Sequence, residues 1–165
     1  MRAIVVEHPG GPDVLQMGEA PDPVPGPGEL LARVHATALN RLDLLQREGR
    51  YPLPPGAPDT LGVEMAGEVT GWGDGVTGFS RGDRVCALLL GGGYAEQVAV
   101  PAAMAIPIPA TLSYEEAAAI PEVLGIEHPD ERLLRDGAMP PDERPEVVEM
   151  PCDGLLAGCD ERLEP

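Results

Sequence analysis

A chain of 165 residues and 17.3 kDa has the length of one domain, or of one domain followed by a tail. Its formal net charge of −17 repels phosphate backbones and anionic lipids, which argues against nucleic-acid-binding and peripheral membrane proteins. No segment reaches the roughly 18 apolar residues of a membrane span. The N-terminus has only a four-residue apolar run, too short for a signal peptide. We therefore expect a cytoplasmic protein.

The first 123 residues alternate short apolar runs with glycine- and proline-rich turns. This pattern predicts strands, in chain order, over residues 2–6, 14–18, 29–39, 63–72, 83–89 and 94–100. Leucines at 42, 44 and 45 predict a short helix over residues 40–47. Ser113 and Glu116 have the spacing of a capping box, which predicts a second helix through alanines 117–119. The pattern indicates a mainly β domain with short helices, either a small barrel or a sandwich.

Residues 124–165 differ in composition from the residues before them. They contain 12 acidic residues, four arginines and six prolines, and their apolar residues show no sustained periodicity. Burial in such a segment does not offset the entropy of ordering the chain. We predict an irregular acidic tail with one short helix over residues 130–135.

One motif suggests a nucleotide site but has the wrong surroundings. Residues 73–78 match G-x-G-x-x-G, which binds a dinucleotide when a strand precedes the glycines and a helix follows them. Here a predicted strand follows, so we interpret the glycines as a loop between strands.

Metal and nucleophile patterns are also missing from the sequence. The chain has three scattered histidines and three cysteines without a CxxC pair. No Ser-His-Asp or Cys-His arrangement follows from the spacing. We therefore predict no metal site.

One segment is specific as a string: residues 38–69 read ALNRLDLLQREGRYPLPPGAPDTLGVEMAGEV. It closely resembles the zinc-independent NAD(P)H:quinone oxidoreductases of the medium-chain dehydrogenase/reductase superfamily, the zeta-crystallin-like group. Three further stretches agree: MRAIVVEHPGGPDVLQ, FSRGDRVCALLLGGGYAEQVAVPA and TLSYEEAAAIPE. The resemblance covers residues 1–123. It implies a GroES-like, alcohol dehydrogenase-like catalytic domain, a partly open β-barrel that carries the substrate side of an active site.

The same resemblance addresses zinc. Zinc-dependent relatives have a cysteine where this chain has Asn40, and a Gly-His-Glu triplet where it has Gly62-Val63-Glu64. An amide and a valine do not replace a thiolate and an imidazole as ligands. The resemblance and this ligand chemistry together imply a zinc-independent protein.

The resemblance also assigns roles to four residues. The family reduces quinones or enones by hydride transfer from NADPH. By position, Asn40 lines the nicotinamide pocket, and Tyr51 lies beside nicotinamide and substrate, where its hydroxyl could bind a carbonyl oxygen. Asp43 and Glu64 are supporting residues. Structural interpretations stay open: Asn40 as a helix N-cap, Tyr51 as a cover for a proline loop, and the two carboxyls as buried charges needing partners.

The resemblance stops at residue 123. Relatives continue into a Rossmann domain, but residues 124–165 contain no strand-glycine-helix unit, and 42 residues are too few for such a domain. A frameshift, an alternative or fused reading frame, or a truncation would each explain the change. Because contacts to the remote part of NADPH are missing, we expect weak or no activity.

Two further expectations follow from a missing second domain. Apolar barrel surface would be exposed, which favours self-association or pairing with a full-length relative. The alternative to a catalytic half is a non-enzymatic interaction module that binds a partner or an intact paralogue, because a fold alone does not fix a function.

Overall fold

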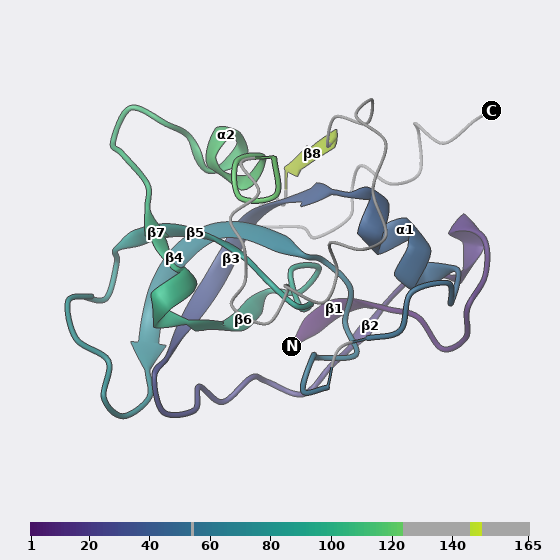
Figure 1. Cartoon of the computed structure of the whole chain (residues 1–165), viewed down its shortest axis with the longest axis horizontal. Coiled ribbons are helices and arrows are strands. Elements are labelled where there is room, and N and C mark those ends of the chain that lie inside the picture. Colours follow the sequence, from purple (N-terminus) through teal and green to yellow (C-terminus); the bar gives the residue numbers. More distant parts are fainter. Residues whose placement is uncertain (54, 124–145, 150–165) are drawn as a thin grey trace.

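A two-stranded hairpin, a larger sheet and two short helices make up the part of the chain that the structure describes (Figure 1). The structure is a computed structural model, and it describes residues 1–53, 55–123 and 146–149. Its strands and α-helices are β1 (Arg2–Val5), β2 (Gln16–Glu19), β3 (Glu29–Leu39), α1 (Arg41–Arg47), β4 (Glu64–Trp72), β5 (Arg84–Leu88), β6 (Gln97–Pro101), β7 (Ile106–Pro107), α2 (Tyr114–Ala118) and β8 (Glu146–Glu149). Short 3-10 turns lie at Pro12–Val14 and Ala102–Met104.

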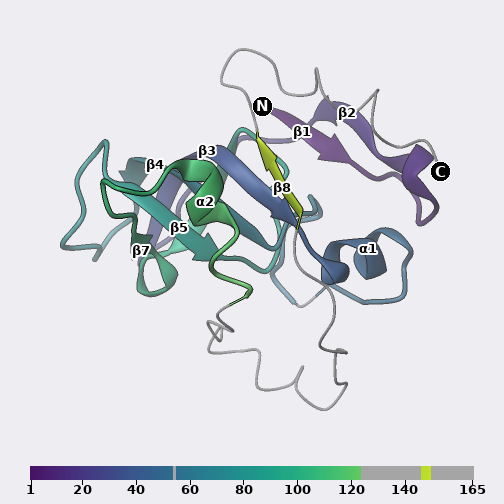
Figure 2. The same ribbon diagram turned by 90° about the horizontal axis from the view of Figure 1, so that it is seen from above.

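The larger sheet is built around β3, and its strand order is β6-β3-β4-β5-β7. β4 pairs with one edge of β3 over residues 30–36, and β6 pairs with the other edge over residues 29–33. β8 extends that second edge over residues 36–39, and Figure 2 shows it alongside β3. All these pairings are antiparallel, and the sheet is open. The predicted mainly β class, with short helices and an open GroES-like arrangement, is confirmed.

Both faces of the sheet are buried, each against its own apolar cluster. The larger cluster is aliphatic and contains Leu30, Ala32, Val34, Met65, Val69, Val85, Ala87, Leu89, Val98 and Val100. The smaller cluster lies beneath α2, which contacts β3, β4 and β5, and contains Ala36, Ala66, Cys86, Ile108, Ala117 and Ala118. The core is therefore mainly aliphatic, in keeping with a sequence in which only 3% of the residues are aromatic.

An irregularity in β3 explains how one strand serves both clusters. Leu30, Ala32 and Val34 alternate toward the larger cluster with the period of two that a strand imposes. The register with β4 shifts between Val34 and Ala36, and Ala36 belongs to the smaller cluster. Such a bulge redirects the side chains that follow it. It therefore sets the direction of the last residues of β3, which lead to the candidate site.

Close backbone packing holds the loop before β4 against the glycine run before β6. Gly62 has φ = +103°, and a Cβ atom there would lie 2.5 Å from the backbone nitrogen of Tyr94. A Cβ at Gly93 would lie 2.6 Å from the carbonyl oxygen of Glu64. Backbone hydrogen bonds join the two segments, from Gly93 to Gly62 at 2.9 Å and from Tyr94 to Leu61 at 2.9 Å. Only glycine permits this approach.

The predicted elements are found with shifted ends. The predicted last strand began at Tyr94, but β6 begins at Gln97 because the preceding residues bond to β1: Ile4 donates to the Tyr94 carbonyl and Glu96 donates to the Arg2 carbonyl. The capping box of α2 is confirmed, since Ser113 and Glu116 each accept the other's backbone N–H. Residues 73–83 connect β4 to β5 without a helix, so the glycine motif is a loop as predicted.

The predicted helix over residues 130–135 lies outside the described residues. Residues 146–149 belong to the tail predicted as irregular, yet they form β8. Beyond Arg33 the edge of β3 no longer pairs with β6, so its backbone groups need another partner. Val147 and Val148 are β-branched residues that favour strands. No helix in the described ranges has the length and apolar character needed to cross a membrane.

Candidate functional site

The candidate site lies where β3 ends and α1 begins. Asn40 occupies the N-cap position of α1 with extended backbone angles, φ = −114° and ψ = 158°. It is only 4% exposed, and Asp43 on α1 and Glu64 at the start of β4 are 2% and 0% exposed. These three residues, each singled out from the sequence, lie in one buried hydrogen-bonded network. Tyr51 is not part of that network among the described contacts.

Asp43 accepts hydrogen bonds from three different segments. Its Oδ2 accepts the backbone N–H of Asn40 at 2.8 Å and the Tyr94 hydroxyl at 3.0 Å. Its Oδ1 accepts the backbone N–H groups of Gly62 and Val63, both at 3.2 Å. The carboxylate therefore joins the start of α1, the loop before β4 and the loop before β6.

Glu64 holds the side chain of Asn40. Its Oε1 accepts from Nδ2 of Asn40 at 2.7 Å, and its Oε2 accepts from the backbone N–H of Glu122 at 2.9 Å. The Thr37 hydroxyl donates to the carbonyl oxygen of Glu64 at 2.6 Å. Glu64 thus links the Asn40 amide to the segment that follows α2.

Burial dominates the electrostatics of the two carboxyl groups. Removal from water raises the pKa of Asp43 to about 6, although its four hydrogen bonds act in the opposite direction. Burial likewise raises the pKa of Glu64 to about 7, against the hydrogen bonds from Asn40 and Glu122. Within the described part of the chain neither group forms an ion pair. Glu64 can therefore change its protonation near neutral pH.

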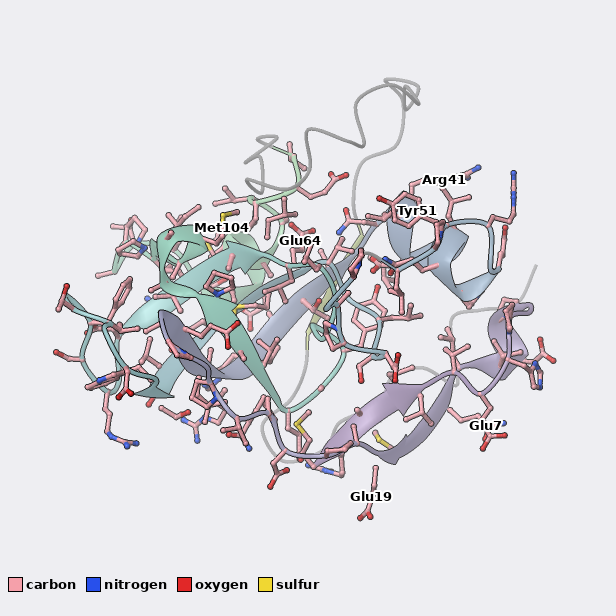
Figure 3. The ribbon with its side chains drawn as sticks, turned by 60° about the horizontal axis from the view of Figure 1, so that its bottom comes forward. Glu7, Glu19, Arg41, Tyr51, Glu64 and Met104 are labelled. Carbon is pink, nitrogen blue, oxygen red and sulfur yellow. The ribbon has the colours of Figure 1, made fainter. Side chains whose placement is uncertain are left out.

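Tyr51 lies in the loop after α1. Figure 3 shows it at the α1 end of the molecule, with Arg41 labelled nearby and Glu64 farther toward the centre. Its side chain is half-buried and its hydroxyl oxygen is covered. The described hydrogen bonds thus join Asn40, Asp43 and Glu64 directly, and Tyr51 lies in the loop that follows α1.

Tyr94 belongs to the network but was not among the residues selected from the sequence. Tyr94 is 6% exposed, and burial raises the pKa of its hydroxyl above the ordinary tyrosine value. The nearby Asp43 carboxyl group raises this pKa further. The available signal was the run Gly91-Gly92-Gly93 directly before it. Such a run indicates close backbone approach, which would direct attention to the next side chain.

Potential metal ligands are scattered in the described part of the chain. In the regions that the structure describes, no three His, Cys, Asp or Glu side chains gather as a metal site would require. Cys86 is a buried free thiol on β5, and burial raises its pKa to about 11, so it is a poor thiolate donor. Zinc independence stays a prediction from the sequence.

The arrangement presents a buried amide flanked by two carboxyl groups and neutral hydroxyl donors. An amide both donates and accepts hydrogen bonds without carrying charge. It therefore suits a neutral ligand group such as a carboxamide or carbonyl, and the carboxyl partners restrict its rotation.

A family model described as "Alcohol dehydrogenase GroES-like domain" matches residues 26–110. The human "Synaptic vesicle membrane protein VAT-1 homolog" is 40% identical over 122 residues, which are 73% of this chain and 31% of that protein. The rat "Quinone oxidoreductase" is 38% identical over 122 residues, covering 73% and 37%. The chain spans about a third of the length of these relatives.

Solved structures agree with this likeness. A human VAT-1 homolog-like protein superposes with a TM-score of 0.70 at 37% identity, covering 77% of this chain and 42% of that one. An Escherichia coli quinone oxidoreductase complexed with NADPH gives 0.67 at 36% identity, covering 73% and 37%. The resemblance inferred from the sequence is confirmed. The chain belongs to the alcohol dehydrogenase GroES-like domain family, whose members here include quinone oxidoreductases of the medium-chain dehydrogenase/reductase superfamily.

Proposed function

We propose that residues 1–123 form the catalytic half of a zinc-independent oxidoreductase that uses NADPH to reduce quinones or enones, with residues 124–165 as a tail that adds β8 to its sheet. The observation that carries this proposal is the buried Asn40 amide, held at 2.7 Å by Glu64 where β3 ends. The likeness to a rat quinone oxidoreductase and to an E. coli quinone oxidoreductase complexed with NADPH supports it.

The donor set fits a nicotinamide better than a metal. The Asn40 amide is engaged by a carboxyl group, and the neighbouring Val63 side chain is apolar and 2% exposed. Asn40 and Tyr51 offer neutral hydrogen-bonding groups that match a carboxamide and a carbonyl oxygen. A metal centre would need imidazole, thiolate or carboxylate groups directed at one ion, whereas Asp43 and Glu64 accept hydrogen bonds from protein donors.

Each proposed residue has one task. NADPH, when bound, supplies the hydride. Asn40 orients the carboxamide of the nicotinamide, and Glu64 fixes the Asn40 amide so that this orientation costs little entropy on binding. Tyr51 would offer its hydroxyl as a hydrogen-bond donor to the carbonyl oxygen of a substrate, which gains negative charge during reduction. Asp43 holds the backbone of Asn40.

These residues reach only the nicotinamide end of the cofactor. Remote contacts supply most of the binding energy that holds a reacting ring in place. We therefore expect this chain alone to bind NADPH weakly and to reduce quinones slowly or not at all.

The test is saturation-transfer NMR with NADPH on the full chain, comparing wild type with Asn40→Asp. The matched control is Gln16→Glu, which makes the same amide-to-acid change at an exposed position on β2. We expect transfer to the nicotinamide protons in wild type and in the control, and its loss in Asn40→Asp. Absence of transfer in wild type, or equal transfer in all three proteins, would overturn the proposal.

A second candidate function is an interaction module. Leu39 and Leu44 lie on either side of Asn40 in sequence and are 36% and 40% exposed. Exposed leucines at the candidate site favour association with a second copy or with a full-length relative. Light scattering of the purified chain across a range of concentrations, alone and mixed with a full-length quinone oxidoreductase, tests this function: a stoichiometric complex supports it, and monomers in both cases contradict it.

A further inference from the structure

The hydroxyl of Tyr94 reaches the candidate site from a loop that is remote in sequence. The backbone of Tyr94 is fixed on two sides, because its N–H donates to Leu61 at 2.9 Å and its carbonyl accepts from Ile4 at 2.8 Å. The ring is buried and its hydroxyl lies 3.0 Å from Oδ2 of Asp43. The carbonyl oxygen of Ala38 is more distant, at 3.4 Å. The single hydroxyl proton therefore goes to Asp43.

The oxygen that Tyr94 contacts is the one that holds Asn40. Oδ2 of Asp43 accepts both the Tyr94 hydroxyl and the backbone N–H of Asn40, whereas Oδ1 accepts Gly62 and Val63. Without the hydroxyl, Oδ2 would keep one donor in a site that excludes water. A buried carboxylate oxygen that loses a donor binds a proton more readily. A proton on Oδ2 would weaken its hydrogen bond from Asn40.

We propose that Tyr94 is a positioning residue for the Asn40 amide and acts through Asp43. It keeps Asp43 as an acceptor, Asp43 fixes the backbone of Asn40, and Glu64 fixes its side chain. The amide is thereby held from both ends. This inference rests on the proposed function, in which Asn40 is the residue that meets the nicotinamide.

Among the described contacts of Asp43, Tyr94 is the one side-chain donor, and the other donors are backbone N–H groups. From α1 comes the backbone N–H of Asn40, and from the loop before β4 come the N–H groups of Gly62 and Val63. Glu64 on β4 is the nearby titratable group of like charge. Backbone donors cannot be removed by ordinary substitution, so Tyr94 is where the network can be altered without changing its main chain.

The test compares Tyr94→Phe with Tyr114→Phe in the full chain. Tyr114 stacks on His35 with ring centroids 4.3 Å apart, so its substitution removes a hydroxyl while keeping a stacked ring outside the network. In Tyr94→Phe we expect the midpoint of the Asp43 titration, followed by NMR at its carboxyl carbon, to rise by about one pH unit, because one charge-assisted hydrogen bond is lost. We also expect the side-chain amide signals of Asn40 to move. Neither should change in Tyr114→Phe.

A folded Tyr94→Phe variant with unchanged Asp43 titration and unchanged Asn40 signals would overturn the inference. If that variant does not fold, 3-fluorotyrosine at position 94 keeps the hydroxyl and makes it a stronger donor. The Asp43 midpoint should then fall, and a midpoint that stays constant or rises contradicts the inference. These readouts need no cofactor. If they shift as expected while Asn40→Asp leaves NADPH binding intact, the proposed function fails and the positioning role stands.

Discussion

Two groups of acidic residues in this molecule are held by opposite means. At the candidate site, Asp43 and Glu64 are buried, and every described residue that donates a hydrogen bond to them does so from an uncharged group. On the surface, Glu96 in the loop before β6 pairs with Arg2 on β1, with 2.6 Å between Oε1 and the guanidinium. Burial raises the pKa of the first pair, whereas hydrogen bonds and charge from Arg2 lower the pKa of Glu96.

The stability of the fold depends more on its buried polar groups than on its exposed ion pairs. When a buried carboxyl group loses its hydrogen-bond donors, it is left unpaired away from water and costs the full free energy of desolvation. The same cost arises when the buried donors lose their carboxyl group. An exposed ion pair is replaced by water at little cost. We therefore expect substitutions at the candidate site to lower the free energy of unfolding strongly, and substitutions on the surface to lower it little. The stability contributed by the buried carboxyl groups should fall as the pH rises, whereas that contributed by the surface pair should fall as the pH decreases.

The largest effect is expected from Asp43→Ala. It leaves four donors from three segments without their acceptor, and we expect a loss of about 3–5 kcal/mol in the free energy of unfolding. Urea unfolding followed by circular dichroism measures this loss. Asp74→Ala, at an exposed loop position, is the matched control and should change stability by less than about 0.5 kcal/mol. A similar, small effect for both variants would contradict the central place given to Asp43.

The second largest expected effect is a decrease in the stability of the wild-type protein as the pH rises. Because the folded pKa of Glu64 is about 7, above the ordinary glutamate pKa of 4.5, the folded protein holds more protons than the unfolded chain between these values. Stability from this group is therefore complete below about pH 4.5 and falls as the pH rises toward 7. We expect a decrease of roughly 3 kcal/mol at most between pH 5 and pH 8.

Glu64→Gln provides the check, because glutamine keeps an acceptor for Asn40 and does not titrate. Stability of this variant should depend less on pH between 5 and 8. Asp43, whose pKa is raised to about 6, contributes to the remaining slope, as do Glu122, whose pKa burial raises, and His35, whose pKa burial lowers. Urea unfolding at several pH values measures both proteins. A wild-type stability that rises across this range would show that the raised pKa values are wrong.

Much of the fold could be predicted because its signals are local. The apolar positions Leu31, Val34, Ala36 and Ala38 predict a strand where β3 is found. Ser113 with Glu116 predicts the start of α2. The register shift after Val34 has no such signal, since it depends on the pairing of β3 with β4. β8 was missed because strand formation there depends on a free edge of β3, which is 107 residues or more away in sequence.

The candidate site could be predicted in part. Asn40, Asp43 and Glu64 were selected by resemblance, and their contacts join them across 24 residues of sequence. Tyr94 was missed because its link to Asp43 spans 51 residues and arises from the packing of the glycine loop on Gly62. Their roles, and that of Tyr51, stay predictions.

A smaller effect is expected from Thr37→Val, which keeps the shape of the side chain and removes one hydroxyl. That hydroxyl donates to the buried carbonyl of Glu64 at 2.6 Å, so we expect a loss of about 1–2 kcal/mol. Thermal unfolding measures it, and Thr70→Val is the control, since Thr70 donates to Leu31 at a partly buried position and 3.2 Å. Equal losses in the two variants would show that depth of burial does not distinguish these hydrogen bonds.

The smallest effect is expected from Arg2→Ala. The substitution removes the guanidinium but keeps the backbone N–H of residue 2, which donates to Oε2 of Glu96 at 2.9 Å. We expect a change of at most about 1 kcal/mol in the free energy of unfolding, reduced further by added salt.

The stability contributed by Glu96 changes with pH in the opposite direction to that contributed by Glu64. Because the pKa of Glu96 is lowered in the fold, its stabilisation is present above the ordinary glutamate pKa and is lost as the pH falls below it. Urea unfolding at pH 3.5 and pH 7 in low and high salt measures both dependences. A loss as large as that of Asp43→Ala would remove the distinction between the buried network and the surface pair, because it would mean that β1 is anchored by charge rather than by its backbone bonds to the Tyr94 loop.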